Sequence, residues 1–310
     1  CAGLLASMSG ASRDSAGIIG EAGGLPLLLS AIEKFGAKDP RFITHAARLQ
    51  DNSLQNKYMM SALGATRIVR DLANENYGPA VETAAQCFFT TQCGPGDLTE
   101  KMAVMGYIPR AIKVMQDFAH EPRIRGEVMA IFANCFIPIP RFYLSLMNEG
   151  IVEQAIQAMR DLTAGEEALD EVSPAHLYNN AMTVLTALAS ANKQWKHHIV
   201  EAGAIDEIAK ALQRQGMGLT AEYKGDVGER ACPAAIHLAY APNVLLPACN
   251  ALKLLIKGNR PKMTALGVPD TISTLLSATE QHDRLTSTTC SGLLEMLQQG
   301  VKDGADGVVE

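Results

Sequence analysis

The hydrophobic positions along the chain follow the spacing of amphipathic helices. After Gly203, for example, the apolar residues Ile205, Ile208, Ala209 and Leu212 lie on one face of a helix. No segment shows the sustained two-residue alternation, enriched in Val, Ile and Thr, that is typical of strands. The sequence therefore predicts an all-α fold.

One sequence phrase recurs six times: a short apolar or acidic lead, a glycine, and the start of an amphipathic helix. Glycine permits a left-handed turn between two helices, so a β-branched residue there should be strained and should clash. Successive anchoring glycines are 41, 42, 44, 53 and 64 residues apart. The first three intervals match the period of about 40–47 residues found in helical repeats. The anchors are Gly23, Gly64, Gly106, Gly150, Gly203 and Gly267.

The segment ALASANKQWKHHIVEAGAIDEIAKAL at 187–212 resembles the armadillo-repeat family, at the junction of two repeats. The resemblance implies a right-handed α-solenoid of about six repeats, a single domain over 1–300 and a concave groove lined by the third helix of each repeat. Residues 301–310 should be a frayed tail. The phrase GGLPLLLSAI at 23–32 is also similar to cytoplasmic or ciliary armadillo scaffolds of algae and protists.

The family's peptide receptors carry an Asn on each third helix and a Trp four residues earlier. Of the positions that lie sixteen residues before an anchor, only Asn134 matches, while Thr90 and Ala187 stand at two of the others. No Trp occupies the expected places, which disfavours a nuclear-import type of peptide receptor. We expect these three residues on a flatter, more apolar partner-binding face. The alternative for Asn134 is a surface polar residue or a local cap.

Two insertions, at 160–174 and 213–233, interrupt the regular spacing. The first holds Glu166, Glu167, Asp170 and Glu171 within six residues. Insertions in repeat proteins map to one face and often bind partners. We expect the acidic cluster to attract a basic partner surface, and the alternative is a solvated loop without a partner.

Composition and charge limit the possible classes. Apolar residues make up 47% of the chain, which allows a core and excludes general disorder. A net charge of −6 disfavours nucleic-acid binding, and no uncharged stretch is long enough for a membrane span. The seven cysteines are scattered without a CxxC pair, so we expect reduced thiols and an intracellular, cytoplasmic protein. A ciliary location is the alternative. The chain begins at Cys1, so residues missing at either end and an organelle location stay open.

The chain carries no recognisable catalytic or cofactor motif. It lacks a phosphate-binding GxxxxGK[ST] loop, an HExxH zinc motif and a serine or cysteine nucleophile in a known setting. We therefore expect a non-enzymatic protein without a cofactor or metal. One unusual segment is the aromatic run at 132–147, where Pro138 and Pro140 should break the helix. It predicts either the core of a kinked repeat or an exposed binding hot spot.

The leading hypothesis for function is a protein–protein interaction scaffold or adaptor, as a subunit of a larger intracellular assembly. A metabolite-regulated armadillo domain is the main alternative, for which HEPRIR at 120–125 offers a basic cluster. An enzyme is the third class.

Overall fold

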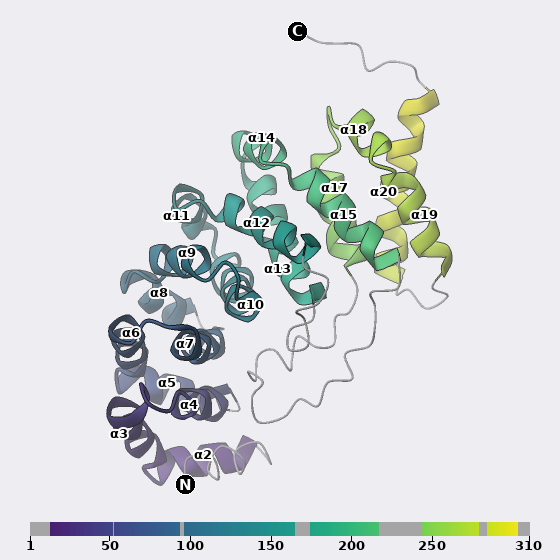
Figure 1. The fold of residues 1–310 in the computed structure, drawn as a ribbon. Coiled ribbons are helices and arrows are strands. Elements are labelled where there is room, and N and C mark those ends of the chain that lie inside the picture. The colour runs from purple at the N-terminus through teal and green to yellow at the C-terminus, as the bar shows by residue number, and fades with distance from the viewer. Residues whose placement is uncertain are drawn as a thin grey trace. The chain divides into compact units, whose positions relative to one another are not determined.

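The computed structural model describes residues 13–51, 53–93, 96–164, 174–216, 244–278 and 284–302. Every regular element within these ranges is a helix, which confirms the all-α prediction for the part of the chain described. The helices group into two compact units with their boundary between Glu149 and Gly150. Figure 1 colours unit 1 from purple to blue and unit 2 from teal to yellow.

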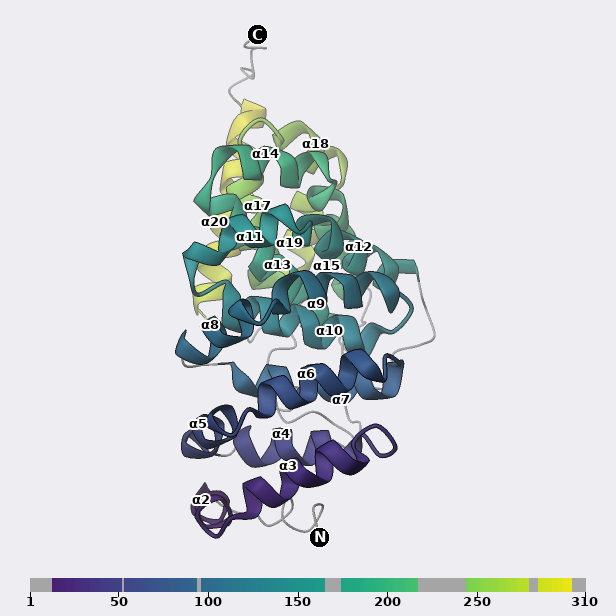
Figure 2. The same ribbon diagram turned by 90° about the vertical axis from the view of Figure 1, so that its left-hand side faces the viewer.

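Unit 1 combines long helices with shorter ones that precede the anchoring glycines. Helix α4 packs on α7, and α7 packs on α10, while α3 also contacts α6. Figure 2 shows the shorter helices α2, α5 and α8 following one another along one side of this unit. The elements of unit 1 are α2 (Arg13–Glu21), α3 (Gly24–Phe35), α4 (Arg41–Asp51), α5 (Leu54–Ala62), α6 (Ala65–Glu75), α7 (Pro79–Gln92), α8 (Gly96–Val104), α9 (Tyr107–Asp117), α10 (Pro122–Ile131), η1 (Phe132–Phe136), η2 (Pro140–Phe142) and α11 (Tyr143–Asn148).

Unit 2 is built around another series of packed helices. Helix α13 packs on α17, and α17 packs on α20, while α15 contacts α12, α17 and α19. Helices α13, α17 and α20 each contribute buried leucine side chains, which are Leu185 and Leu188, Leu252, and Leu293 respectively. The elements of unit 2 are α12 (Ile151–Ala164), α13 (Pro174–Ala191), α14 (Lys193–Glu201), α15 (Ala204–Gly216), α17 (Leu245–Leu255), α18 (Arg260–Ala265), α19 (Val268–Ala278) and α20 (Arg284–Lys302).

The six anchoring glycines all adopt the left-handed conformation, with φ between 68° and 96°. At Gly106 the amide donates to the carbonyl of Ala103 at 2.9 Å, and α9 begins at the next residue. A Cβ atom at Gly106 would meet nothing within 4 Å. The predicted turn is thus confirmed, but the expected clash is wrong, because backbone strain alone makes glycine necessary here. Gly258 is a further left-handed glycine that the pattern did not predict.

The proline-rich run after α10 breaks the helix as predicted. The amide of Ile137 donates to the carbonyl of Phe132 at 2.9 Å, which widens the last turn into a π-helix before Pro138. The ring of Phe136 stacks on Tyr107 at 5.8 Å, and Tyr107 also meets Phe89 edge-on at 5.2 Å. These rings are buried, so this part of the run is core rather than an exposed hot spot.

A disulfide joins Cys93, just after α7, to Cys135 in η1, with their Cα atoms 5.0 Å apart. This pair corrects the expectation that all cysteines are reduced thiols. The two residues are 42 positions apart, as are Gly64 and Gly106. Cysteines separated by this interval lie side by side because α7 and α10 are neighbours, whereas a search for closely spaced cysteines does not find them.

Candidate functional site

Thr90 lies in α7, where it is only 5% exposed. Its hydroxyl is 2.8 Å from the carbonyl of Gln86 and 3.0 Å from Oε2 of Glu127 on α10. The hydroxyl proton is therefore held between two acceptors within unit 1. The prediction that Thr90 touches a partner gains no support from this burial.

Asn134 and Ala187 are more accessible than Thr90. Asn134 is exposed on η1, and Ala187 is half-buried on α13 of unit 2. The structure does not bring these two residues into one site, because they belong to different units.

The two predicted binding loops lie largely outside the described residues. This applies to the acidic cluster, which consists of Glu166, Glu167, Asp170 and Glu171, and to 217–233 of the second insertion.

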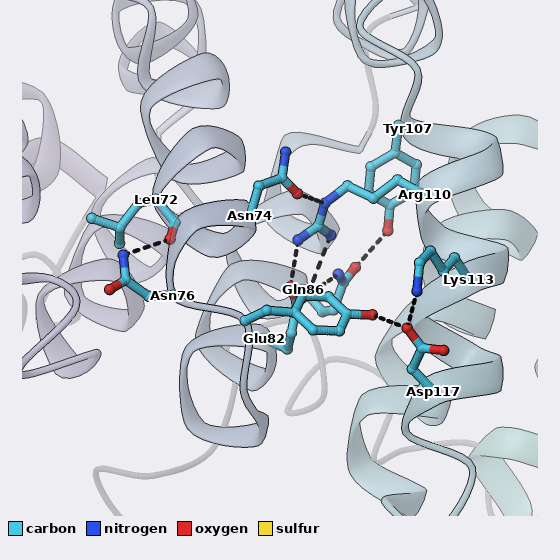
Figure 3. A network of polar contacts seen from close by, with 10 residues as sticks. Leu72, Asn74, Asn76, Glu82, Gln86, Tyr107, Arg110, Lys113 and Asp117 are labelled. Atoms are coloured by element: carbon cyan, nitrogen blue, oxygen red, sulfur yellow. Dashed lines mark hydrogen bonds and ion pairs between the residues drawn. The ribbon is translucent and has the colours of Figure 1, made fainter.

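A buried ion pair links α7 and α9 in unit 1 (Figure 3). The carboxylate of Glu82 is fully buried and accepts two hydrogen bonds from the guanidinium of Arg110, one of them at 3.2 Å. Nε of Arg110 also donates to Oδ1 of Asn74 on α6 at 2.7 Å. Gln86 donates to Glu82 at 3.0 Å and accepts from the Tyr107 hydroxyl at 2.6 Å. The network thus satisfies a buried charge rather than presenting a reactive group.

Burial raises the pKa of the Tyr107 phenol well above its usual range, and the nearby carboxylates of Glu82 and Glu127 act in the same direction. At the outer edge of the network, the Tyr77 hydroxyl donates to Asp117 at 2.8 Å. The pKa of Asp117 is lowered by its hydrogen bonds from Lys113 and then Tyr77. These shifts follow from burial and pairing, so they do not indicate a general acid or base.

Unit 2 has a polar contact that corresponds to the contact between Asn74 and Arg110 in unit 1. The residues that form it lie the same numbers of positions after their anchoring glycines. Asn74 lies ten residues after one anchor and contacts Arg110, four residues after the next. In unit 2, Arg160 and Glu207 hold these two positions and are 3.3 Å apart. Glu207 is buried, but Arg160 is 47% exposed and the second cation on Glu207, Lys210, is also largely in solvent.

Unit 1 contains a groove of about 460 Å³ between the start of α6 and the length of α8, which we call the α6–α8 groove. Val104 stands in its wall and is 88% exposed. The ammonium of Lys101 donates to the hydroxyl of Ser61 at 3.2 Å, which connects α8 to the end of α5 beside the groove. The groove is lined by Ser61, Gly64, Thr66, Arg67, Asp97, Glu100, Lys101, Val104 and Met105.

Unit 2 contains a groove of similar volume, about 480 Å³, between α12 and α14, which we call the α12–α14 groove. The imidazole of His198 lies 2.7 Å from Oε1 of Glu153, and Glu201 lies 3.1 Å from His197. In this groove the carboxylates of Glu153 and Glu201 each lie within hydrogen-bonding distance of a histidine imidazole. Its lining residues are Glu153, Ile156, Gln157, Arg160, His198, Glu201 and Ala202.

Large apolar side chains are exposed along the short helices of unit 1. Polar bonds connect these helices in order, since Tyr58 donates to Asp97 at 3.4 Å and Arg141 pairs with Glu100. Exposed apolar residues that gather into a patch are typical of an interaction surface. The exposed apolar residues on or next to these helices are Ile18, Leu54, Tyr58, Leu63, Val104 and Leu144, and we call them the apolar row.

The described residues offer little to a metal or a metabolite. Among them, no group of three His, Cys, Asp or Glu side chains could hold a metal ion. In the basic segment at 120–125, Arg125 is buried and donates to the carbonyl of Ala119 at 2.9 Å. No helix in the described ranges has the length and apolar character needed to cross a membrane.

The comparisons with known proteins bear on the fold alone. No family model matches the chain, and no curated protein does. Two engineered proteins crystallised by the Northeast Structural Genomics Consortium each superpose with a TM-score of 0.60 at 14% identity, over 89% of this chain and 97% or 99% of their own. A third engineered protein from this source gives a TM-score of 0.58 at 16% identity, over 96% of this chain and 74% of its own.

The residues that line the α6–α8 groove were not among those predicted from the sequence, which lie on the third helices and in the insertions. The sequence does contain an indication of this groove. Arg67 lies three residues after one anchoring glycine, and Lys101 lies five residues before the next one. Comparison of the charges at these two positions along the chain would have singled out this groove.

Proposed function

We propose that the chain is an armadillo-type α-solenoid that binds other proteins and has no catalytic activity of its own. The left-handed glycines and the pairing of Asn74 with Arg110 and of Arg160 with Glu207 at corresponding positions support the repeat architecture. We propose that the chain acts as a subunit of a larger assembly; the Cys93–Cys135 disulfide removes the reduced-thiol argument for an intracellular compartment.

The observation that carries the binding function is the apolar row on the short helices of unit 1. Val104 and Leu144 are 88% and 60% exposed, although both lie on helices whose other faces are buried. Removing such side chains from water gains about 25 cal/mol per Å² of apolar area. A partner that covers the row would gain this free energy, whereas the isolated chain cannot.

The polar chemistry is consistent with this proposal. Glu82, Gln86, Thr90 and Tyr107 are buried and bonded to each other or to neighbours, so they stabilise helix packing. A catalytic constellation instead needs groups aimed at a space where a substrate can sit. The scaffold function is therefore better supported than an enzyme or a metabolite sensor.

The test is to capture partners with the full chain and then to reconstitute the complex from purified components. Proteins retained from a native extract are identified by mass spectrometry, and each candidate is mixed with the chain and examined by size-exclusion chromatography with light scattering. We expect a complex of defined stoichiometry that the double variant Val104→Asp, Leu144→Asp no longer forms. Leu27→Asp is the matched control, because Leu27 is an equally exposed leucine on α3. Failure of every purified candidate to form a complex would contradict the proposal.

A further inference from the structure

Two positions counted from the glycines contact each other at two junctions between a short helix and the helix that follows the preceding glycine. One is the third residue after a glycine, and the other is the fifth residue before the next glycine. In unit 2 these positions hold Glu153 and His198, 2.7 Å apart, and then Asp206 and Lys262, 2.6 Å apart. Both junctions therefore place an acidic residue opposite a basic one.

The corresponding junction in unit 1 places two cations opposite each other. Arg67 lies three residues after Gly64, and Lys101 lies five residues before Gly106. Both line the α6–α8 groove. Two cations cannot form the contact that Glu153 makes with His198 or Asp206 with Lys262, because like charges repel. The groove thus has two cations at positions that hold acid–base contacts at the two junctions of unit 2. At the other junctions of unit 1 these positions hold uncharged residues, Pro26 with Met59 and Pro109 with Ser145.

The groove is also lined by two carboxylates, Asp97 and Glu100. Glu100 is paired with Arg141, whereas Asp97 accepts a hydrogen bond from the Tyr58 hydroxyl, a neutral donor that does not offset its charge. Neither carboxylate is within ion-pair distance of Arg67 or Lys101 in the described structure. An anion that enters the groove would therefore find two cations that form no ion pair among the described residues, and it would be directed to them and away from the Asp97 carboxylate.

An apolar contact lies beside this cationic site. Val104 is almost fully exposed, and Leu63 next to Gly64 is 42% exposed. At the position of Val104, two residues before the glycine, the α12–α14 groove has Glu201 instead. The α6–α8 groove thus combines an anion-attracting pair with an apolar wall in a volume of about 460 Å³.

We infer that the α6–α8 groove docks an acidic segment of a partner protein, with a carboxylate between Arg67 and Lys101 and a neighbouring aliphatic or aromatic side chain against Val104. The inference rests on the proposed scaffold function and names the chemistry of its partner. Local charge complementarity selects this occupant, because Arg67 and Lys101 both line the groove and form no ion pair among the described residues.

The experiment measures binding of two short fluorescein-labelled peptides to the full chain by fluorescence anisotropy. One peptide alternates Leu with Asp and Glu, and the other has Lys in place of every acidic residue. We expect the acidic peptide to bind and the basic peptide to bind at least about tenfold more weakly. Binding of the acidic peptide should weaken as salt screens the exposed charges.

The variants locate the site. Arg67→Glu and Lys101→Glu should each raise the Kd of the acidic peptide at least about tenfold, because each introduces a repelling carboxylate. Val104→Asp should weaken binding as well. Lys34→Glu is the matched control, because it makes the same change of charge at an exposed position on α3 and should leave the Kd unchanged. Circular dichroism checks that the variants keep their helix content.

Each other outcome overturns the inference. It fails if the acidic peptide does not bind, if the basic peptide binds as tightly, or if Lys34→Glu weakens binding as much as Arg67→Glu does. These failures are distinguishable from failure of the scaffold function. A purified partner that forms a complex while the acidic peptide does not bind leaves the scaffold function intact and removes only the docking site.

Discussion

The α6–α8 groove of unit 1 and the α12–α14 groove of unit 2 have nearly the same volume, about 460 and 480 Å³, but different charges. Where unit 1 has Arg67, unit 2 has Glu153, and where unit 1 has Lys101, unit 2 has His198. In unit 2 the imidazole of His198 and the carboxylate of Glu153 lie 2.7 Å apart and contact each other, whereas unit 1 has two cations at the corresponding positions. Similar shapes therefore have different binding chemistry.

The buried carboxylates of the two units show the opposite contrast in how their cationic partners are protected from water. In unit 1, Glu82 and its cation Arg110 are both largely removed from water. In unit 2, Glu207 is buried but its cations Arg160 and Lys210 are about half exposed. The interior of unit 1 is thus the more strictly paired, although its surface groove is the less paired. Loss of an ion-pair partner should have different costs in the two units.

The largest expected effect is on stability. Glu82→Gln removes the charge opposite Arg110 and should lower the free energy of unfolding by about 3–5 kcal/mol, because it leaves a buried cation uncompensated. Glu207→Gln should cost about 1 kcal/mol or less, since Arg160 and Lys210 can return to water. Urea unfolding followed by circular dichroism measures both. Equal losses in the two variants would remove the distinction between the two units.

The glycine turns should behave alike in the two units. Gly106→Val and Gly203→Val should each lower the free energy of unfolding by about 1–3 kcal/mol, because a β-branched residue is strained at positive φ. Gly78→Ala is the control, since Gly78 has an extended backbone and an added methyl group would make only an ordinary contact with the carbonyl oxygen of Asn76, 4.0 Å away. Thermal melts of the three variants test this directly. If both valine variants melt with the wild type, the turns do not need glycine.

A smaller effect should follow from exchanging the charges of the two grooves. Arg67→Glu creates an acidic residue opposite Lys101, as in unit 2, and should raise stability by up to about 1 kcal/mol. Glu153→Arg creates a cation opposite His198, as in unit 1, and should not raise it. Urea unfolding at low and high salt checks both signs, because screening should reduce both changes. A gain for Glu153→Arg would show that these positions do not interact.

The acidic insertion should affect association without changing stability. Reversal of Glu166, Glu167, Asp170 and Glu171 to Lys should slow association with a purified partner at low salt and matter little at high salt. Surface plasmon resonance at two salt concentrations measures the rates. The result separates a steering role of unit 2 from the docking role of unit 1. If low-salt association is unchanged and substitution of Lys113 or Gln157 abolishes it, partner binding lies on another face.

The helices and the turns between them were largely predictable from the sequence. The glycines predicted as turns are left-handed, and Pro138 and Pro140 end the helix where expected. Local physical rules govern these features, because glycine favours positive φ and proline lacks the amide hydrogen that a helix needs. The cysteine pairing was not predictable in this way, since Cys93 and Cys135 meet only when α7 packs on α10.

The candidate site was predictable only in part. Asn134 is exposed as a binding residue should be, but Thr90 at the equivalent position is buried against Glu127. The exposure of each residue depends on which helix covers it, and no local pattern encodes that neighbour. The charges of Arg67 and Lys101 are visible in the sequence, but their sharing of one groove is not.

The sequence by itself determined the helical class, the positions of the turns and the charge at each position counted from a glycine. These depend on backbone preferences and hydrophobic spacing over a few residues. Only the tertiary structure decided which of those charges face each other, which are buried and which remain available. Those outcomes depend on contacts between residues about 40 positions apart, such as Lys101 with Ser61, and such contacts form only when successive helices pack together.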